Sequence, residues 1–308
     1  DRALIILLLT CCSMAFAQQQ PAATGDDSAP EATFRSDTRL VELHATVTDK
    51  QGRILENLPE RAFKVFENDV PQQIKDFRRE DAPVSLGLII DNSASMRNKR
   101  AQVAAALLTL VRASNPGDEE FVMNFNEQPE VVQDFTRNIG ELEATLNKID
   151  SSGSTALRDA LAMALAHVTR LGKNEKKVLL VVTDGEDNSS AETLARLSRR
   201  AQQSGVLIYA IGLLNESNER EAMRAKHDLD TLTFETGGEV FYPAELSEVD
   251  AIARHVAHDL RNQYTITYIP TDQKQDGTYR RIKVAVGIPE GSTVRTRSGY
   301  YASARPES

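Results

Sequence analysis

Five oxygen-bearing side chains in three separate segments have the types and spacing expected of a divalent-cation site. They are Asp91, Ser93, Ser95, Thr155 and Asp184. Carboxylate and hydroxyl oxygens are hard ligands, which suit Mg²⁺ or Mn²⁺ better than zinc. The sequence therefore offers two carboxylates and three neutral hydroxyls to a single metal ion.

Two apolar runs must position the carboxylates. Residues 84–90 and 178–182 are nearly continuous apolar sequence, as expected for parallel strands buried on both faces. Asp91 follows the first run directly, and Asp184 follows the second after one residue. Ligands of open α/β sheets bind beyond the carboxyl ends of the strands. We therefore expect these two carboxylates to lie together at one edge of a sheet.

The surrounding sequence alternates strand and helix patterns. A third apolar run covers residues 206–211, and apolar residues recur at helical spacing within 103–111, 157–168, 194–201 and 246–260. This alternation predicts an α/β fold with a doubly wound, mostly parallel, Rossmann-like sheet over residues 83–262.

Strand patterns with one solvated face flank this predicted domain. They cover residues 40–47, 63–67, 73–77, 264–268, 281–286, 293–295 and 300–301. Asn68-Asp69 is predicted to be a hairpin turn between 63–67 and 73–77. We expect the two flanks, 36–82 and 263–305, to pair into a small β-sandwich-like module into which the α/β domain is inserted.

The chain starts with an apolar run that ends in Ala15-Phe16-Ala17, which is typical of a secretory signal peptide and its cleavage site. No Met and little positive charge precede the run, so we interpret residues 1–17 as an N-terminally incomplete signal peptide. A membrane anchor is disfavoured because spanning a bilayer takes roughly 20 apolar residues. Residues 18–35, rich in Gln, Pro and Ala, are interpreted as a flexible leader. We expect export to the periplasm, cell surface or medium, with no transmembrane span in the mature chain.

Charge and cysteine content exclude several classes of function. The 308 residues include 36 Lys or Arg and 45 Asp or Glu, a net charge of −9. This acidity disfavours nucleic acid as the main partner. The two cysteines, Cys11 and Cys12, would leave with the signal peptide. The mature chain would then have no disulfide, thiolate metal site or cysteine nucleophile.

Other polar residues have simpler interpretations. Ser95 and Thr155 would also serve as helix N-caps, and Asp184-Gly185 as a turn, but their coincidence at strand ends favours a metal site. The remaining polar groups are interpreted as solvated or surface charges. Asp159, Glu186 and Asp187 are placed at the rim of the site, with an outer-shell role as the alternative. His255 and His258 lie three residues apart on one helix, where solvated histidines are favoured over a metal pair. On strand faces, surface charges are favoured over an anion site for Arg280, Arg281, Arg295 and Arg297.

The pattern Asp91-x-Ser93-x-Ser95, then Thr155, then Asp184 within Thr-Asp-Gly, resembles the metal-ion-dependent adhesion site of von Willebrand factor A-type domains. The order, spacing and strand context match over about residues 83–262. The flanking segment 58–68 (LPERAFKVFEN) and the tail residues 263–264, 276–277, 281–284 and 299–300 are similar to a group of secreted bacterial proteins related to this family.

The resemblance implies a secreted, divalent-metal-dependent protein-binding module and not an enzyme. In that family the positions matching Ser93 and Ser95 ligate the metal directly, and the position matching Thr155 does so in the ligand-bound state. Those matching Asp91 and Asp184 bind directly or through water. An Asp or Glu of the partner protein completes the coordination. Mg²⁺ is the expected ion, with Mn²⁺ or Ca²⁺ as alternatives.

The main alternative is a Mg²⁺-dependent phosphoryl-transfer enzyme with Asp91 as its nucleophile. Haloacid-dehalogenase-type phosphatases use such an Asp but require a second one two residues later, where this chain has Ser93. A serine hydrolase and a dinucleotide enzyme are disfavoured because neither Gly-x-Ser-x-Gly nor Gly-x-Gly-x-x-Gly occurs.

Overall fold

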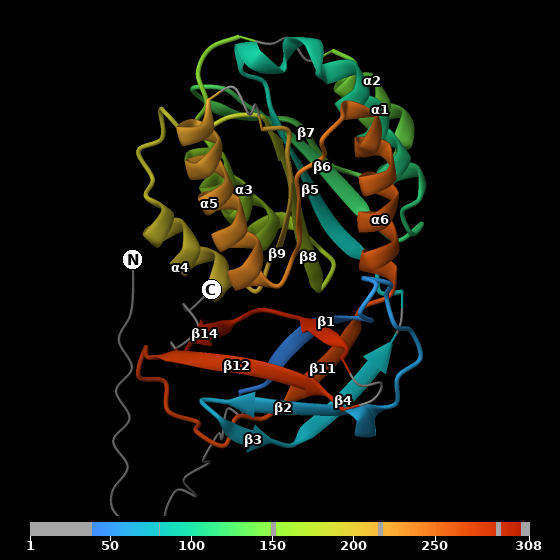
Figure 1. Ribbon diagram of the computed structural model, residues 1–308, viewed down its shortest axis with the longest axis vertical. Coiled ribbons are helices and arrows are strands. Elements are labelled where there is room, and N and C mark those ends of the chain that lie inside the picture. The colour runs from blue at the N-terminus through green and yellow to red at the C-terminus, as the bar shows by residue number, and fades with distance from the viewer. Residues whose placement is uncertain (1–38, 80, 149–151, 215–217, 288–290, 303–308) are drawn as a thin grey trace, which may run out of the picture. The chain divides into compact units, whose positions relative to one another are not determined.

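A six-stranded sheet forms the centre of the α/β part of the computed structural model (Figure 1). Its order is β10-β9-β8-β5-β6-β7, and every neighbouring pair is parallel except β6 and β7. The central strand β5 is buried along its whole length. The strands are β5 (Val84–Asp91), β6 (Glu119–Phe125), β7 (Pro129–Thr136), β8 (Lys176–Thr183), β9 (Leu207–Gly212) and β10 (Val240–Phe241).

Helices cover both faces of this sheet, with α1, α2 and α6 on one face and α3, α4 and α5 on the other (Figure 1). Strand side chains alternate between the two cores, so that Leu88 packs beneath the first group and Ile89 beneath the second. The helices are α1 (Arg100–Arg112), α2 (Ile139–Leu146), α3 (Leu157–Leu171), α4 (Leu194–Ser204), α5 (Glu219–Thr236) and α6 (Val249–Arg261). Short 3₁₀ helices cover Glu60–Ala62, Ala94–Asn98 and Leu246–Glu248.

The predicted doubly wound α/β fold is confirmed, although the sequence patterns missed α2, α5, β6, β7 and β10. Helix α5 was missed because its buried face includes Asp228, Thr233 and Thr236 alongside Leu229 and Leu232, so its apolar periodicity is weak.

The structure describes residues 39–79, 81–148, 152–214, 218–287 and 291–302. The predicted signal peptide and leader lie outside these ranges. Across the described part of the chain, no helix is long and apolar enough to cross a membrane.

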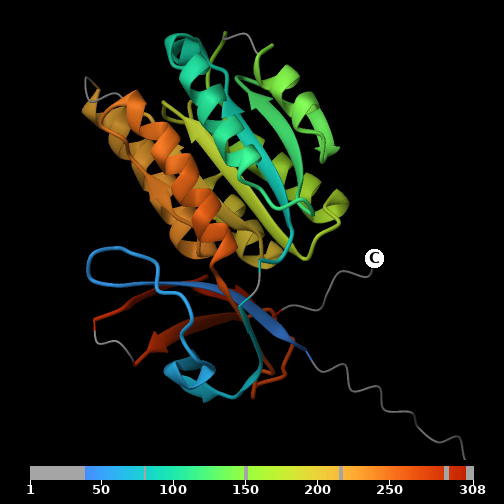
Figure 2. The same cartoon turned by 90° about the vertical axis from the view of Figure 1, so that its right-hand side faces the viewer.

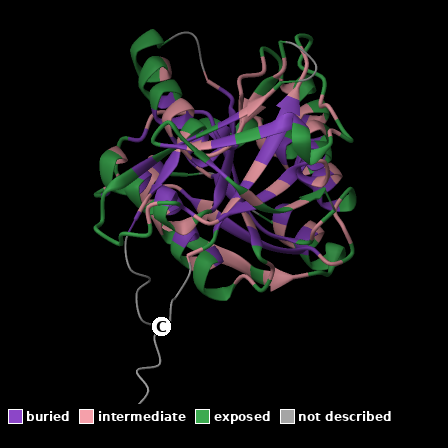
Figure 3. Ribbon diagram, turned by 90° about the horizontal axis from the view of Figure 1, so that it is seen from below, coloured by how far each residue is buried: buried purple, intermediate pink, exposed green. Residues whose placement is uncertain are grey.

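The flanking segments form two antiparallel sheets, each built from strands that precede and follow the α/β part. Their orders are β13-β1-β11-β4 and β14-β12-β2-β3. In Figure 2 the blue and red strands of the two flanks interleave, and Figure 3 shows buried residues along the strands of the molecule. The strands are β1 (Val41–Thr48), β2 (Phe63–Glu67), β3 (Val70–Gln72), β4 (Ile74–Arg79), β11 (Tyr264–Tyr268), β12 (Tyr279–Val286), β13 (Thr293–Arg295) and β14 (Gly299–Tyr301).

These pairings agree with the predicted insertion of the α/β part between two paired flanks. Val41 of β1 lies opposite Tyr268 of β11, and Val65 of β2 lies opposite Val284 of β12. The core between the two flanking sheets is therefore formed by strands that are distant in sequence. The boundaries at 82/83 and 262/263 stay a proposal about where independent domains begin and end.

The predicted hairpin around Asn68-Asp69 is shorter than expected. Both residues have positive φ, 48° and 65°, which suits the tight turn that joins β2 to β3. The chain then leaves this sheet, and β4 pairs with β11 in the other sheet. The expected pairing of 63–67 with 73–77 is wrong beyond Gln72, because the residues that follow belong to the opposite sheet.

A buried carboxylate links the flanking strands to the α/β part. Asp259 of α6, fully buried, accepts hydrogen bonds from Thr46 Oγ1 of β1, Tyr209 OH of β9 and Arg295 Nη2 of β13, each at 2.6 Å. Burial alone would raise the pKa of Asp259, but the charge of Arg295 and these three hydrogen bonds lower it below its usual value. Arg295, predicted to be a strand-face charge, is thus part of a buried network.

We expect Asp259→Ala to lower the free energy of unfolding by about 3–5 kcal/mol, because it removes the buried acceptor that Thr46, Tyr209 and Arg295 share. Urea denaturation followed by circular dichroism measures this change. Asp250→Ala, at the exposed start of the same helix, is the matched control and should have a small effect. Equal effects of the two substitutions would contradict a linking role for Asp259.

Candidate metal site

The candidate ligands lie where the central sheet changes its direction of winding. The chain runs from β5 through α1 to β6 on one side of β5, whereas β8 pairs with β5 on the other side. Ile90 lies opposite Val182, so Asp91 at the end of β5 is beside Thr183 at the end of β8. Ligands of open α/β sheets bind in the crevice at such a point.

Asp91 is fixed by hydrogen bonds to both of its carboxylate oxygens. Oδ1 accepts the backbone N–H of Ser93 at 2.8 Å, and Oδ2 accepts the hydroxyl of Thr183 at 2.6 Å. The residue is fully buried. Burial raises the pKa of Asp91, the nearby charge of Asp184 acts in the same direction, and the hydrogen bonds from Thr183 and Ser93 oppose both. A buried carboxylate of this kind is stabilised by a nearby cation.

Three further oxygens form a continuous contact at the same edge. Ser93 Oγ lies 3.1 Å from Ser95 Oγ, which donates a hydrogen bond of 2.7 Å to Asp184 Oδ1. Met96, fully buried, anchors the 3₁₀ turn that carries the two serines, and Ser95 itself is exposed. The hydroxyls therefore stand between the buried carboxylates and solvent.

Thr155 is brought to this edge by backbone contacts between loops. Its N–H donates to Asn188 Oδ1, and its carbonyl accepts the N–H of Asn188, both at 3.0 Å. The Thr155 hydroxyl faces the turn after Asp184, because a Cβ added to Gly185 would lie 3.7 Å from Oγ1. The structure thus gathers all five predicted side chains around the carboxyl ends of β5 and β8.

Lys99 is a member of this cluster that the sequence patterns missed. Its ammonium donates to Asp184 Oδ2 at 2.6 Å and to the carbonyl of Leu213 at 3.2 Å. Lys99 follows Ser95 by four residues, about one helical turn. This spacing is the feature of the sequence that could have placed Lys99 near the site. Thr183, quoted only as part of the Thr-Asp-Gly motif, was also missed as the residue that orients Asp91.

The neighbouring acidic residues organise the loop instead of forming a solvated rim. Asp187 Oδ2 accepts the N–H of Arg158 at 2.7 Å, and Asp159 accepts the backbone N–H groups of Ala191 and Glu192, in the loop before α4. The rim interpretation is therefore wrong for Asp159 and Asp187. Glu186 forms an ion pair with Arg224 at 2.9 Å.

The two histidines of α6 do not form a metal pair. His255 lies 3.4 Å from Glu239, which raises the pKa of His255, and His258 lies 3.4 Å from Glu56. Within the described ranges, no group of three or more His, Cys, Asp or Glu side chains could hold a metal ion. The candidate site differs in kind, because it combines two carboxylates with hydroxyls.

This geometry defines a class of protein. It is an open α/β domain that carries carboxylates and hydroxyls where the sheet changes its direction of winding. A family model described as the von Willebrand factor type A domain matches residues 86–186, which include all five candidate ligands. Residues 86–186 therefore match the family that the sequence motifs predicted, and the observed sheet has the fold expected of such a domain.

Three similar proteins differ from this chain in length or share little sequence identity with it. The human collagen alpha-6(VI) chain is 25% identical over 178 residues, which cover 50% of this chain and 8% of the collagen chain. Proximal thread matrix protein 1 from the mussel byssus, in a structure with a zinc-occupied MIDAS motif, is 18% identical with a TM-score of 0.50. That match covers 62% of this chain and 48% of the mussel chain. The vWF domain of the pilus tip protein Mfa5 from Porphyromonas gingivalis is 13% identical with a TM-score of 0.46, covering 58% and 97%.

We expect Lys99→Met to tighten Mg²⁺ binding by about tenfold, because it removes a cation that occupies Asp184 Oδ2. Isothermal titration calorimetry measures this affinity. Without metal the same variant should melt at a lower temperature, since the Asp184 carboxylate is left buried without its ion pair.

Lys177→Met, at the opposite end of β8, is the control for losing one positive charge. An unchanged or weaker Mg²⁺ affinity in Lys99→Met would show that Lys99 and the metal do not compete for Asp184.

Proposed function

We propose that this chain is a divalent-metal-dependent protein-binding module, which captures an acidic residue of a partner protein at the carboxyl ends of β5 and β8. The observation that carries the proposal is the contiguous set of oxygens from Ser93, Ser95 and Asp184 beside the buried carboxylate of Asp91. Ser93, Ser95 and Asp184 would hold the ion, with Asp91 and Thr155 completing the protein's share of the site.

The chemistry of the donor set supports a small, hard divalent ion. Ser93, Ser95 and Asp184 offer hydroxyl and carboxylate oxygens in one hydrogen-bonded group. Oxygen ligands of this kind suit Mg²⁺ or Mn²⁺. We therefore propose Mg²⁺ as the ion, with Mn²⁺ as the next candidate and Ca²⁺ after it.

Charge explains why the loaded site would attract a carboxylate. A divalent ion and the Lys99 ammonium together carry one positive charge more than the two carboxylates, Asp91 and Asp184, remove. When bound, the metal supplies this concentrated charge and an open coordination position. The exposed Ser95 side of the site leaves room for an Asp or Glu from another protein. An acidic chain can thus bind an acidic partner through the ion.

The geometry favours binding over phosphoryl transfer. A nucleophilic Asp91 would need one carboxylate oxygen free to attack, yet both oxygens accept hydrogen bonds and the side chain is fully buried. Ser93 stands where haloacid-dehalogenase-type phosphatases have a second Asp. We propose that the protein is not an enzyme.

We also propose that the mature protein acts outside the cytoplasm. The apolar run and the Ala15-Phe16-Ala17 site support export through a signal peptide.

We expect Asp184→Asn to weaken Mg²⁺ affinity by about 100-fold or more, and Ser95→Ala to weaken it by about tenfold. Asp184→Asn removes the negative charge of the carboxylate, and Ser95→Ala removes the hydroxyl oxygen. Calorimetry measures both, and circular dichroism checks that the fold persists. Glu186→Gln lies on the same loop outside the oxygen set and should bind Mg²⁺ as the wild type does. Wild-type affinity in both ligand variants would rule out the proposed site.

Partner capture should depend on the metal in the same way. Immobilised protein should retain a specific protein from envelope and medium fractions in Mg²⁺ and release it when EDTA is added. Asp184→Asn should retain none of it under either condition. Retention that EDTA and Asp184→Asn leave unchanged would place partner binding elsewhere on the molecule.

A further inference from the structure

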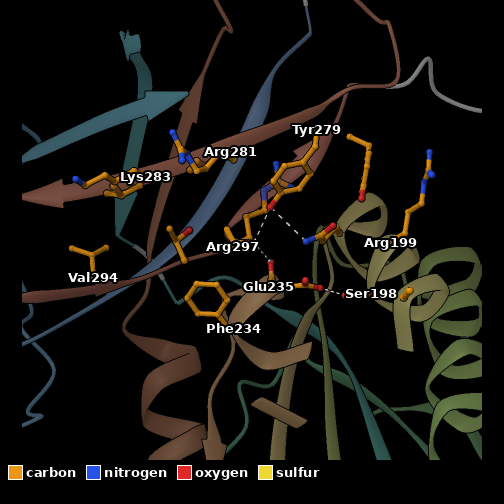
Figure 4. Close-up of a pocket in the computed structure, with 16 residues that line it drawn as sticks. Ser198, Arg199, Phe234, Glu235, Tyr279, Arg281, Lys283, Val294 and Arg297 are labelled. Atoms are coloured by element: carbon orange, nitrogen blue, oxygen red, sulfur yellow. Dashed lines mark hydrogen bonds between the residues drawn. The ribbon is translucent and has the colours of Figure 1, made fainter. Parts of the chain in front are cut away.

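A groove of about 700 Å³ lies between α4, the end of α5 and the exposed face of β12 (Figure 4). None of its lining residues belongs to the candidate metal site. In Figure 4, Tyr279, Arg281 and Lys283 follow one another along β12. Ser198 and Arg199 of α4 lie at the Tyr279 end of this row, away from Lys283. The groove falls in the size range of sites that enclose small ligands or short peptide segments.

The groove concentrates positive charge in a chain whose net charge is −9. Its lining contains a single carboxylate, Glu235, which accepts a hydrogen bond from Ser198 Oγ and whose pKa is raised by burial. Four cations also line the groove, namely Arg199, Arg281, Lys283 and Arg297. Such a local excess of positive charge favours an anionic ligand.

Most of these cations lack an acidic partner within the described ranges. Arg199 stacks over the ring of Tyr301 at 4.6 Å, and no ion pair joins Arg199, Lys283 or Arg297 to a carboxylate there. Arg281 pairs with Asp69, but both side chains are exposed, and such surface pairs exchange readily. Arg199, Arg281 and Lys283 are exposed and are therefore available to a ligand.

Arg297 contributes to the groove differently from the other three cations. Its guanidinium carbon lies 5.5 Å from the centre of the Tyr300 ring, and its Nε is buried without a hydrogen-bond partner among the described residues. Arg297 therefore adds positive charge beneath the groove, and the exposed cations provide the contacts with a ligand.

The spacing of the groove residues matches an extended peptide. Tyr279, Arg281 and Lys283 occupy alternate, exposed positions of β12, so neighbouring members repeat at about 7 Å. Alternate side chains of an extended peptide repeat at the same distance. Phe234, 72% exposed, and Tyr279, 37% exposed, offer apolar surface beside the cations. Exposed aromatic side chains grouped with cations are typical of peptide-binding surfaces.

We infer that this groove binds an extended acidic peptide segment of a partner protein, with carboxylates at alternate positions facing Arg281 and Lys283 and an apolar side chain packed on Phe234 and Tyr279. This second binding surface needs no metal. It is independent of the proposed capture of a carboxylate at the ends of β5 and β8.

Fluorescence anisotropy with the full chain tests this inference. The probe is a fluorescein-labelled synthetic peptide with Glu at two alternate positions, Phe at the next alternate position and Ser between them, and its counterpart carries Gln at both Glu positions. We expect the Glu peptide to bind and the Gln peptide to bind at least about tenfold more weakly. No binding of the Glu peptide, or equal binding of the two peptides, would overturn the inference.

Surface substitutions locate the binding. Lys283→Glu and Phe234→Ala should each weaken binding of the Glu peptide by about tenfold. Lys75→Glu makes the same charge change on the exposed face of β4 and should change the affinity by less than about twofold. Equal effects of Lys283→Glu and Lys75→Glu would reduce the binding to general charge attraction and overturn the groove assignment.

The metal site gives an independent readout. EDTA and Asp184→Asn should leave binding of the Glu peptide unchanged, and Lys283→Glu should leave Mg²⁺ affinity unchanged. Loss of peptide binding in EDTA would assign the peptide to the metal site and overturn the inference. If Mg²⁺ does not bind but the Glu peptide still binds in EDTA, only the proposed metal-dependent function is contradicted.

Discussion

The parallel pairing of β5 with β8 is the constraint on which the candidate site depends. Its register sets Asp91 beside Thr183, whose hydroxyl fixes the buried carboxylate, and it places Asp184 one residue further along. The helices only need to cover the sheet and return the chain to it. The serines after β5 and the loop before α3 then meet the same edge, because their backbones hydrogen-bond across it.

Electrostatics organises this acidic chain at three places in different ways. At the strand ends, two buried carboxylates are balanced in part by Lys99 and favour a cation. At the junction with the flanking strands, Asp259 and Arg295 balance each other inside the protein. In the groove along β12, cations exceed carboxylates, which favours an anion. Net charge alone would have predicted none of these local arrangements.

The sheet and the candidate ligands were predictable because their signals are local. A strand buried on both faces is a continuous apolar run, and Asp91 and Asp184 directly follow such runs. Lys99 and Asp187 were harder, because their roles depend on which loops meet in space. Arg295 was mistaken for a surface charge because only the fold brings it to Asp259. Helix α5 was missed because polar residues occupy its buried face.

The proposed function depends on where a divalent ion binds. A crystal structure of the chain grown with Mn²⁺, with data collected at the manganese absorption edge, tests this most directly. We predict an anomalous peak within bonding distance of Ser93 Oγ, Ser95 Oγ and Asp184, with Lys99 withdrawn from the carboxylate. A peak elsewhere, or none at this edge with Lys99 still paired to Asp184, would contradict it.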